Sequence, residues 1–359
     1  MLNLLRKYKF EGGITLIQVK NVTKKYGSFK AIDDISFEVK DGEVVGFLGP
    51  NGAGKSTTMN MITGYIDPTQ GQIIVNGVDV GKRPRKAKKQ IGYMPESVPL
   101  YQELTVREFI RYMAELKLVK HKDIKGEVNK VIEEVGLKDV ENKLIRNLSR
   151  GYKQRVGIAG ALVGNPDVII LDEPTVGLDP KQITEIRDLI KKLGKNHTVI
   201  LSSHILSEVS QICERVIIIN KGKIVAIDTP SNLEDKTKAK NTILVTVEDP
   251  NNNMENIKNK LKEAEEIKLV RDNKDGTKQY AVISDTKYDL RKKLFDILPK
   301  EQIVIFELKK DESTLEDAFI RLIDDSKIEM SENKEKEDNK TEKRLEADDK
   351  KTNKKEEKK

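Results

Sequence analysis

Tryptophan, paired cysteines and long hydrophobic runs are all missing from this sequence of 359 residues. Its single cysteine, Cys213, cannot form an internal disulfide, and one free cysteine is typical of a reducing compartment. No stretch approaches the ~18 apolar residues that a membrane-spanning helix needs. The opening MLNLLRKYKF has basic residues without the apolar core of a secretory signal. We therefore expect no direct membrane span, and any action on a membrane to pass through a partner chain.

Charge is abundant and of both signs. Charged residues make up 35% of the chain and apolar residues 37%, with a net charge of +7. A basic pI could indicate nucleic acid or anionic lipid as a partner. Lysine and glutamate are interspersed, however, as on ordinary solvated surfaces, so we expect no nucleic acid. The dense basic run KRPRKAKK at 82–89 has two interpretations, a solvated loop or helix end and a lipid-contacting patch, of which we favour the first.

Strand and helix patterns alternate through the first two thirds of the chain. Buried-strand patterns occur at 43–49, 167–173 and 197–204, and helical patterns at 55–63 and 183–193. This alternation predicts an α/β fold with a mostly parallel sheet covered by helices. Between about 97 and 147 the apolar residues recur at helical spacing, which indicates a helical insertion into that core.

The order of elements changes after Pro230. The patterns there predict the order βαββαβ, which is that of a ferredoxin-like unit, with helices at 256–266 and 288–298. From about Ser326 the chain is nearly all lysine, glutamate, aspartate and asparagine, so we expect disorder, with a charged helix as the alternative. In chain order, the sequence predicts an extension at 1–15, a first domain at 16–232 with a helical subdomain at 97–150, a small α+β domain at 236–325, and a charged tail at 326–359.

The segment GPNGAGKS at 49–56 fits the phosphate-loop pattern G-x-x-x-x-G-K-[ST]. Glycines allow backbone N–H groups to converge on phosphate oxygens, and a helix that begins near Lys55 directs its positive end at the same charge. Lys55 can reach the β- and γ-phosphates, and the Ser56 hydroxyl can ligate Mg²⁺. The residues predicted to bind the nucleotide are Gly49, Pro50, Asn51, Gly52, Ala53, Gly54, Lys55, Ser56 and Thr57.

Two carboxylates end the apolar strand VIILDE at 168–173. Asp172 is placed to hold Mg²⁺ beside Ser56, and Glu173 to polarise an attacking water. Alone, such a strand end is more often a structural cap. With a phosphate loop upstream, a metal site and a general base are the better interpretation.

The order of motifs along residues 16–230 resembles that of ABC transporter ATPases. LSRGY at 148–152 resembles the signature loop LSGGQ, and Gly177-Leu178-Asp179 resembles the D-loop. Tyr26 matches the aromatic residue on which adenine stacks, and His204 the switch histidine. Taken singly, Tyr26 would more often lie on a strand surface and His204 would more often be structural; the ordered set favours function.

The sequence also departs from the family pattern. Glu96, in IGYMPE, stands where the family usually has the glutamine of its Q-loop; its oxygen can still ligate Mg²⁺ but adds a negative charge. Arg150 replaces a glycine and Tyr152 a glutamine of the signature, whereas Ser149 and Gly151 remain. The resemblance implies that Ser149 and Gly151 contact a nucleotide held by a second subunit.

What the resemblance implies is a P-loop NTPase fold: a RecA-like core, an antiparallel β subdomain and an inserted helical subdomain. It further implies ATP and Mg²⁺ as cofactors, with Ser56, Asp172 and Glu96 around the metal and Glu173 and His204 at the γ-phosphate. The chain would be a peripheral subunit at the cytoplasmic face of the membrane. It would close as a head-to-tail homodimer, or with a related ATPase, and drive a separate transmembrane permease.

Three functions follow from these patterns. A terminal LEDAF element and the IGYMPE and GLDP segments resemble the branch that serves drug, antibiotic, sodium or gliding-motility exporters. The alternative is a soluble ABC ATPase acting on ribosomes or nucleic acid, although no second phosphate loop follows residue 57. A third is a ligand-sensing module at 241–323, against which a dimer-stabilising appendage is the simpler interpretation.

Overall fold

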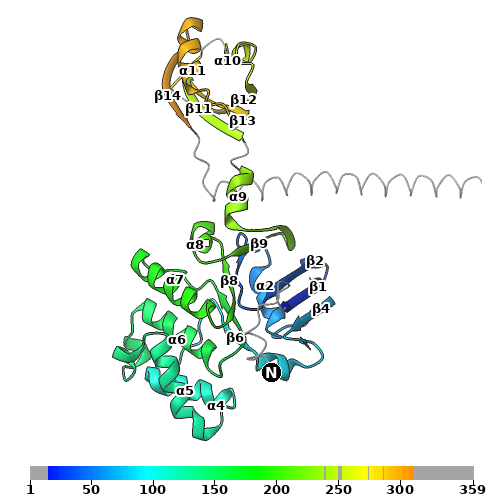
Figure 1. Cartoon of the computed structure of the whole chain (residues 1–359), viewed down its shortest axis with the longest axis vertical. Coiled ribbons are helices and arrows are strands. Elements are labelled where there is room, and N and C mark those ends of the chain that lie inside the picture. Colours follow the sequence, from blue (N-terminus) through cyan, green and yellow to red (C-terminus); the bar gives the residue numbers. More distant parts are fainter. Residues whose placement is uncertain (1–14, 238–239, 250–252, 274, 286, 311–359) are drawn as a thin grey trace, which may run out of the picture. The chain divides into compact units, whose positions relative to one another are not determined.

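The computed structural model of the chain describes residues 15–237, 240–249, 253–273, 275–285 and 287–310. These residues form two compact units that divide between Pro230 and Ser231 (Figure 1). The predictions of an N-terminal extension and of a charged tail at 326–359 lie outside the described residues, as does the terminal LEDAF element. In the described part of the chain, no helix is both long and apolar enough to cross a membrane.

A largely parallel sheet of six strands forms the centre of the first unit, in the order β10-β9-β3-β8-β7-β6. All neighbouring pairs are parallel except β10 with β9, which is antiparallel. Every residue of β3 and of β7 is buried, as expected for strands covered on both faces. The strands are β3 (Val44–Leu48), β6 (Ile91–Met94), β7 (Val168–Asp172), β8 (Thr198–Ser203), β9 (Arg215–Asn220) and β10 (Lys223–Asp228).

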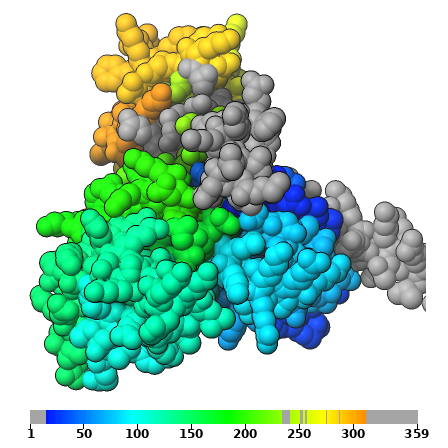
Figure 2. All heavy atoms as spheres, turned by 60° about the horizontal axis from the view of Figure 1, so that its bottom comes forward, coloured from blue at the N-terminus to red at the C-terminus, as the bar shows by residue number. Residues whose placement is uncertain are grey.

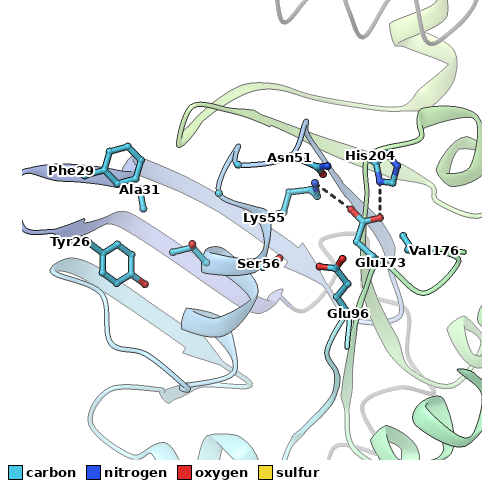
Figure 3. A pocket seen from close by; sticks show the side chains of 13 residues that line it. Tyr26, Phe29, Ala31, Asn51, Lys55, Ser56, Glu96, Glu173, Val176 and His204 are labelled. Carbon is cyan, nitrogen blue, oxygen red and sulfur yellow. Dashed lines mark hydrogen bonds and ion pairs between the residues drawn. The ribbon is translucent and has the colours of Figure 1, made fainter. Parts of the chain in front are cut away.

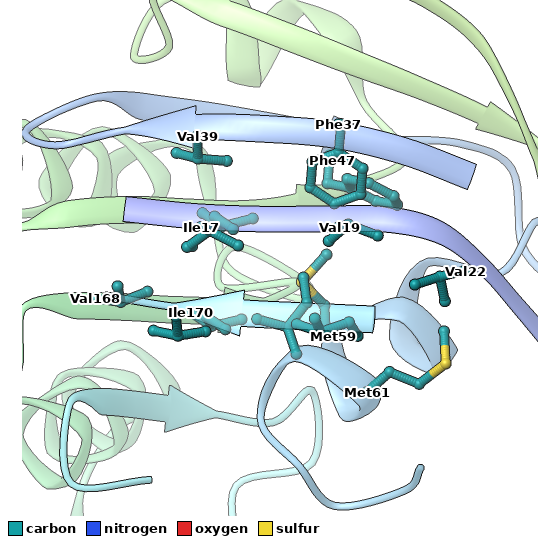
Figure 4. Close-up of a cluster of buried hydrophobic side chains, with 14 of the residues drawn as sticks. Ile17, Val19, Val22, Phe37, Val39, Phe47, Met59, Met61, Val168 and Ile170 are labelled. Carbon is teal, nitrogen blue, oxygen red and sulfur yellow. The ribbon is translucent and has the colours of Figure 1, made fainter. Parts of the chain in front are cut away.

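A second, antiparallel sheet of the first unit has the order β2-β1-β4-β5. Its strands are β1 (Thr15–Tyr26), β2 (Phe29–Lys40), β4 (Gln70–Val75) and β5 (Val78–Asp79). Apolar side chains from this sheet, from the parallel sheet and from helix α2 (Lys55–Ile62) share one core (Figure 4). Phe37 of β2 and Phe47 of β3 meet in it, with ring centroids 5.7 Å apart. This shared core fixes α2, and with it the phosphate loop, against both sheets.

The predicted insertion at 97–150 contains α4 (Val106–Leu116) and α5 (His121–Glu134), and α6 (Arg150–Leu162) begins where the predicted insertion ends. Thr105 and Glu108 form a capping box at the start of α4: each side chain accepts a hydrogen bond from the backbone N–H of the other residue. The cyan to green atoms of the insertion make up an exposed lobe of the first unit (Figure 2). The remaining helical segments of this unit are α3 (Pro84–Lys88), η1 (Lys138–Val140), η2 (Ile145–Asn147), α7 (Pro180–Gly194) and α8 (Leu206–Ser210).

The second unit has one antiparallel sheet in the order β12-β13-β11-β14. Renumbered within the unit this is the order 4-1-3-2, which is the ferredoxin-like arrangement that the βαββαβ pattern predicts. Its elements are α9 (Pro230–Thr237), β11 (Lys240–Glu248), α10 (Met254–Ile257), β12 (Ala264–Asp272), β13 (Thr277–Asp285), α11 (Arg291–Ile297), η3 (Leu298–Glu301) and β14 (Val304–Lys310).

One prediction for the second unit is wrong. The sequence pattern places a helix at 256–266, but α10 ends at Ile257 and β12 already begins at Ala264. Ile257 and Leu261 are buried in the core of the unit, which explains their helix-like spacing. That spacing also suits one helical turn followed by a loop, because both residues need only face the same core.

Candidate functional site

A pocket of about 520 Å³ opens where β3 ends and α2 begins (Figure 3). Its lining joins the phosphate-loop segment to residues from β1, β2 and the ends of β6, β7 and β8. The lining residues are Tyr26, Phe29, Ala31, Asn51, Gly52, Gly54, Lys55, Ser56, Thr57, Glu96, Glu173, Val176 and His204. Most of the residues predicted from separate motifs therefore meet at one place, at the carboxyl ends of the parallel strands, where α/β sheets bind ligands.

The loop at 49–54 adopts a conformation that depends on its glycines. Gly52 and Gly54 have φ of 79° and 112°, which side-chain-bearing residues rarely adopt. A Cβ on Gly49 would lie 2.4 Å from the backbone oxygen of Ile219, so β9 leaves no room there. Helix α2 begins directly after this loop with no side-chain cap at its N-terminus. Its free N–H groups are suited to an anionic ligand, so the loop fits a nucleotide phosphate.

Lys55 and Glu173 form a buried ion pair at the centre of the pocket. Lys55 Nζ lies 3.3 Å from Glu173 Oε1, and both side chains are 6% exposed. The same ammonium donates a 2.8 Å hydrogen bond to the Gly49 carbonyl, which closes the loop around it. On the other carboxylate oxygen, His204 Nδ1 lies 3.0 Å from Glu173 Oε2 (Figure 3). The carboxylate is thus fixed between two nitrogen donors.

The backbone at Glu173 is unusual for a residue with a long side chain. Its φ is 49°, in the left-handed region, directly after the extended strand β7. The Glu173 N–H donates a 2.9 Å hydrogen bond to Ser202 Oγ, which holds this conformation from the neighbouring strand. Strained backbone of this kind is found preferentially at functional sites. Here the turn brings the carboxylate into the pocket.

Oxygen donors suited to a divalent cation come from Ser56 and Glu96 in the pocket lining and from Asp172 at the end of β7, which is not among the lining residues. Asp172 is buried and accepts a hydrogen bond from Ser202 Oγ, and Glu96 lines the same pocket. Burial raises the pKa of Tyr93 to about 12, and the charges of Asp172 and Glu96 contribute to this shift. Among the described residues, no group of three acidic, histidine or cysteine side chains forms a self-sufficient metal site. Hydroxyl and carboxylate oxygens are the kind of donor that Mg²⁺ accepts, and this ion usually keeps phosphate and water oxygens as its other ligands.

Two exposed aromatic rings lie at the outer end of the pocket. Tyr26 is 50% exposed and Phe29 67% exposed, and both line it. Lys24 Nζ lies 5.2 Å from the centroid of the Tyr26 ring, a cation–π contact that occupies one face of the ring. Figure 3 shows both rings on the side of the loop away from Glu173. A flat nucleobase stacked here would place its phosphates toward Lys55.

The signature and D-loop residues lie outside this pocket lining. Ser149 is exposed and caps α6, where its hydroxyl oxygen accepts a 3.5 Å hydrogen bond from the Tyr152 N–H. Asp179 caps α7 in the same way, through a 2.9 Å bond from the Gln182 N–H. The structure therefore brings the phosphate loop, Glu173 and His204 together in one chain but does not bring Ser149, Gly151 or Asp179 to that pocket.

Sequence reasoning missed several residues of the site. Phe29 follows the turn after Tyr26, and its pairing with Tyr26 across β1 and β2 could have been found from the hairpin register. Ser202 contacts both strand-end acidic residues, but nothing in the pattern HTVILSSH distinguishes it from the adjacent Ser203. Val176 enters the pocket through the turn that follows Glu173. Such contacts depend on packing between strands that sequence periodicity does not specify.

Comparisons with known proteins agree on one family. Residues 32–176 match the family model described as ABC transporter. The chain is 37% identical to the uncharacterized ABC transporter ATP-binding protein YhcH of Bacillus subtilis over 326 residues, which cover 88% of this chain and 98% of the relative. It is 45% identical over 212 residues to the bacitracin transport ATP-binding protein BcrA of Bacillus licheniformis, covering 58% of this chain and 68% of that protein.

Solved structures show the same fold. CbiO1 of Clostridium perfringens, part of the ABC transporter complex cbiONQ, superposes with a TM-score of 0.58 at 29% identity, covering 62% of this chain and 92% of that one. A dimeric post-hydrolysis structure of the ATP-binding cassette MJ0796 bound to ADP and Pi has a TM-score of 0.54 at 28% identity, covering 60% and 98%. The fold expected from the sequence, a P-loop NTPase with an inserted helical subdomain, is confirmed.

Proposed function

Because this chain belongs to the ABC transporter ATP-binding proteins, which are ATPases coupled to transport, we propose that it is the motor subunit of an exporter whose membrane domains lie in a separate permease. The single observation that carries this proposal is the cluster of Lys55, Glu173 and His204 at the phosphate loop. Bacitracin transport and linearmycin resistance proteins among its relatives support an exporter rather than an importer. The alternative, an ATPase acting on ribosomes or nucleic acid, has no support among these relatives.

The phosphate loop would grip ATP through its main-chain N–H groups and the Lys55 ammonium. The Tyr26 ring would stack on adenine, at the outer end of the pocket where it already lies exposed. Ser56, Asp172 and Glu96 would hold Mg²⁺, which supplies charge neutralisation for the phosphates when bound. Tyr26, Lys55, Ser56 and Glu96 line one pocket, which supports contact with a single bound nucleotide.

Glu173 would act as the general base that orients and deprotonates the attacking water. Its carboxylate is held between Lys55 and His204 at 3.3 and 3.0 Å. A carboxylate only accepts hydrogen bonds, so His204 Nδ1 carries the proton in this contact. We therefore propose that His204 orients Glu173 beside the γ-phosphate.

A second subunit would complete each site. Ser149 and Gly151 begin α6, whose N-terminal N–H groups and serine hydroxyl suit a γ-phosphate but lie outside the chain's own pocket. Head-to-tail pairing with a second copy, or with a related ATPase, would present them to the partner's nucleotide. Hydrolysis would remove the charge that holds the pair closed, so ATP biases a two-state switch. The insertion containing α4 and α5 would transmit this motion to the permease.

The proposal is tested by two measurements on the purified and the native protein. We expect magnesium-dependent affinity for ATP together with slow ATP hydrolysis by the isolated chain. In native cells we expect the protein at the cytoplasmic face of the membrane fraction, released by detergent. Absence of magnesium-dependent ATP binding would refute the ATPase role, whereas co-sedimentation with ribosomes would refute the transport role alone.

Glu96→Gln is expected to weaken the response to magnesium. The substitution keeps an oxygen donor but removes one negative charge from the Ser56 and Asp172 region. We expect the Mg²⁺ concentration for half-maximal ATPase activity to rise about tenfold, the usual scale for removing a supporting ligand at a metal site. Glu103→Gln is the matched control, because Glu103 is 79% exposed and pairs with Arg146 away from the pocket. An unchanged magnesium dependence would show that the negative charge of Glu96 does not contribute to metal binding.

A further inference from the structure

One face of α6 contacts the segment that follows Glu173 in the same chain. Arg150 Nη1 donates a 3.1 Å hydrogen bond to the Gly177 carbonyl, and Gln154 Nε2 donates a 2.7 Å bond to the Pro174 carbonyl. One turn further along, Arg155 Nη2 pairs with Glu185 Oε2 at 2.9 Å. Positions 150 and 154 share a helix face, whereas Arg155 reaches α7 from the adjacent side of the helix. The helix that carries the signature loop is therefore tied directly to the segment that carries the proposed base.

The Arg150 guanidinium packs closely against Gly177. A Cβ placed on Gly177 would come within 2.4 Å of Arg150 Nη1, 2.6 Å of Cζ and 3.1 Å of Nη2. The φ of Gly177 is 72°, so its backbone also favours glycine. Three atoms of the guanidinium thus occupy space that any other residue at 177 would fill. The hydrogen bond and the close packing are two separate signs that these two residues fit each other.

Local helix preferences do not account for an arginine at this position. Arg150 is the first residue of α6, where the positive end of the helix dipole disfavours a cation. The family signature has a glycine there. A side chain that breaks a local rule at a functional loop calls for a compensating contact. The Gly177 carbonyl provides that contact from outside the helix.

We propose that Arg150 is a positioning residue that holds the 174–177 segment and, through it, the Glu173 carboxylate of its own chain. The Val176 N–H bonds to the Glu173 carbonyl at 3.3 Å, and the Leu178 N–H bonds to the Thr175 carbonyl at 3.2 Å. These bonds make 173–178 one continuous turn, so fixing Gly177 restrains Glu173. The inference rests on the proposed function, because it concerns the same hydrolytic site.

Loss of the Arg150 contact should disturb this segment more than α6. The helix keeps its contacts through Gln154 and Arg155, and most of its residues are buried. The near end of the segment keeps the 2.6 Å bond from Thr175 Oγ1 to Glu208. The far end, at Gly177, loses its guanidinium partner. The expected defect is therefore a misplaced base in the same chain, with ATP binding preserved.

Arg150→Met is expected to lower kcat about 5- to 50-fold, part of the full effect of losing one hydrogen bond from a charged donor, because Arg150 acts on the base indirectly; the ATP dissociation constant should change less than twofold. Arg150→Lys, which keeps a charged donor, should recover most of the rate. Arg146→Met is the matched control, since Arg146 is 55% exposed and pairs only at the surface with Glu103. Unchanged kcat in Arg150→Met, or weakened ATP binding with normal kcat, would overturn the proposal.

Hydrogen exchange separates this inference from the proposed function. In nucleotide-free protein, Arg150→Met should speed exchange of the backbone N–H groups at 175–178 about tenfold, and Arg146→Met should not. This measurement needs neither ATP nor pairing. If Arg150→Met leaves exchange unchanged, the positioning role is overturned even if the protein is an ATPase. If Arg150→Met speeds exchange as expected but the native protein has no ATPase activity, the proposed function is refuted instead.

Mixed dimers test whether Arg150 acts on its own chain or on the partner's nucleotide. Arg150→Met and Glu173→Gln are combined on one chain, or divided between the two chains, of a tagged pair. If Arg150 positions its own Glu173, the combined arrangement keeps the activity of the Glu173→Gln mixed dimer, and the divided one loses it 5- to 50-fold. The reverse result, which direct contact with the partner's phosphates predicts, or equal activity in both, would overturn the proposal.

Discussion

Glu173→Gln is expected to slow ATP turnover by about 10²–10⁴-fold, the usual contribution of a positioned base, and to leave ATP binding intact. The amide has the size of the carboxylate and can still accept a hydrogen bond from His204, which lies 3.0 Å away in the native protein. It cannot take a proton from water. Because pairing would precede hydrolysis, the substituted chain should accumulate as closed dimers in ATP.

Light scattering with and without ATP and magnesium measures this trapping, and phosphate release measures turnover. Glu115→Gln provides a control with the same loss of charge, since Glu115 is a 48% exposed partner of Arg111 on α4. Unchanged turnover in Glu173→Gln would remove Glu173 from the role of base. Slow turnover without dimers would leave the base in place and refute pairing with a second copy.

The parts of the fold that sequence predicted best are those with both faces buried. The runs VVGFL and VIILD form β3 and β7, and every residue in them is buried. Such strands show no alternation, but their position before a phosphate loop and before two carboxylates identifies them. The phosphate loop was predictable for a related reason: its glycines and Lys55 are required by backbone geometry and phosphate charge, whatever packs around them.

Several features depend on tertiary context and were not predicted. Strands β6, β9 and β10 are defined by pairing with neighbouring strands, although the turn Lys221-Gly222 between β9 and β10 is a signal that could have been used. The left-handed backbone of Glu173 is held by Ser202 on another strand, a contact 29 residues away. The sequence showed that Arg150 departs from the signature, but only packing shows that its guanidinium meets Gly177.

Lys55→Ala is expected to weaken ATP binding itself, about 10- to 100-fold, because the ammonium supplies charge-assisted hydrogen bonds to phosphate. This separates Lys55 from Glu173, whose replacement should affect turnover alone. Titration of a fluorescent ATP analogue measures the affinity. Lys82→Ala is the control, since Lys82 is a 79% exposed lysine. An unchanged ATP affinity in Lys55→Ala would contradict the phosphate-loop assignment.

Lys55→Ala should also destabilise the nucleotide-free protein, through the carboxylate that it leaves behind. Glu173 is as buried as Lys55. Removing the ammonium leaves the Glu173 carboxylate in contact with His204 but without the opposing charge of Lys55. An uncompensated buried charge of this kind costs about 1–3 kcal/mol of unfolding free energy. Adding Glu173→Gln removes that charge, so the double variant should be more stable than Lys55→Ala alone, by thermal or denaturant unfolding. Strictly additive losses would show that the ion pair itself contributes nothing to the stability of the fold.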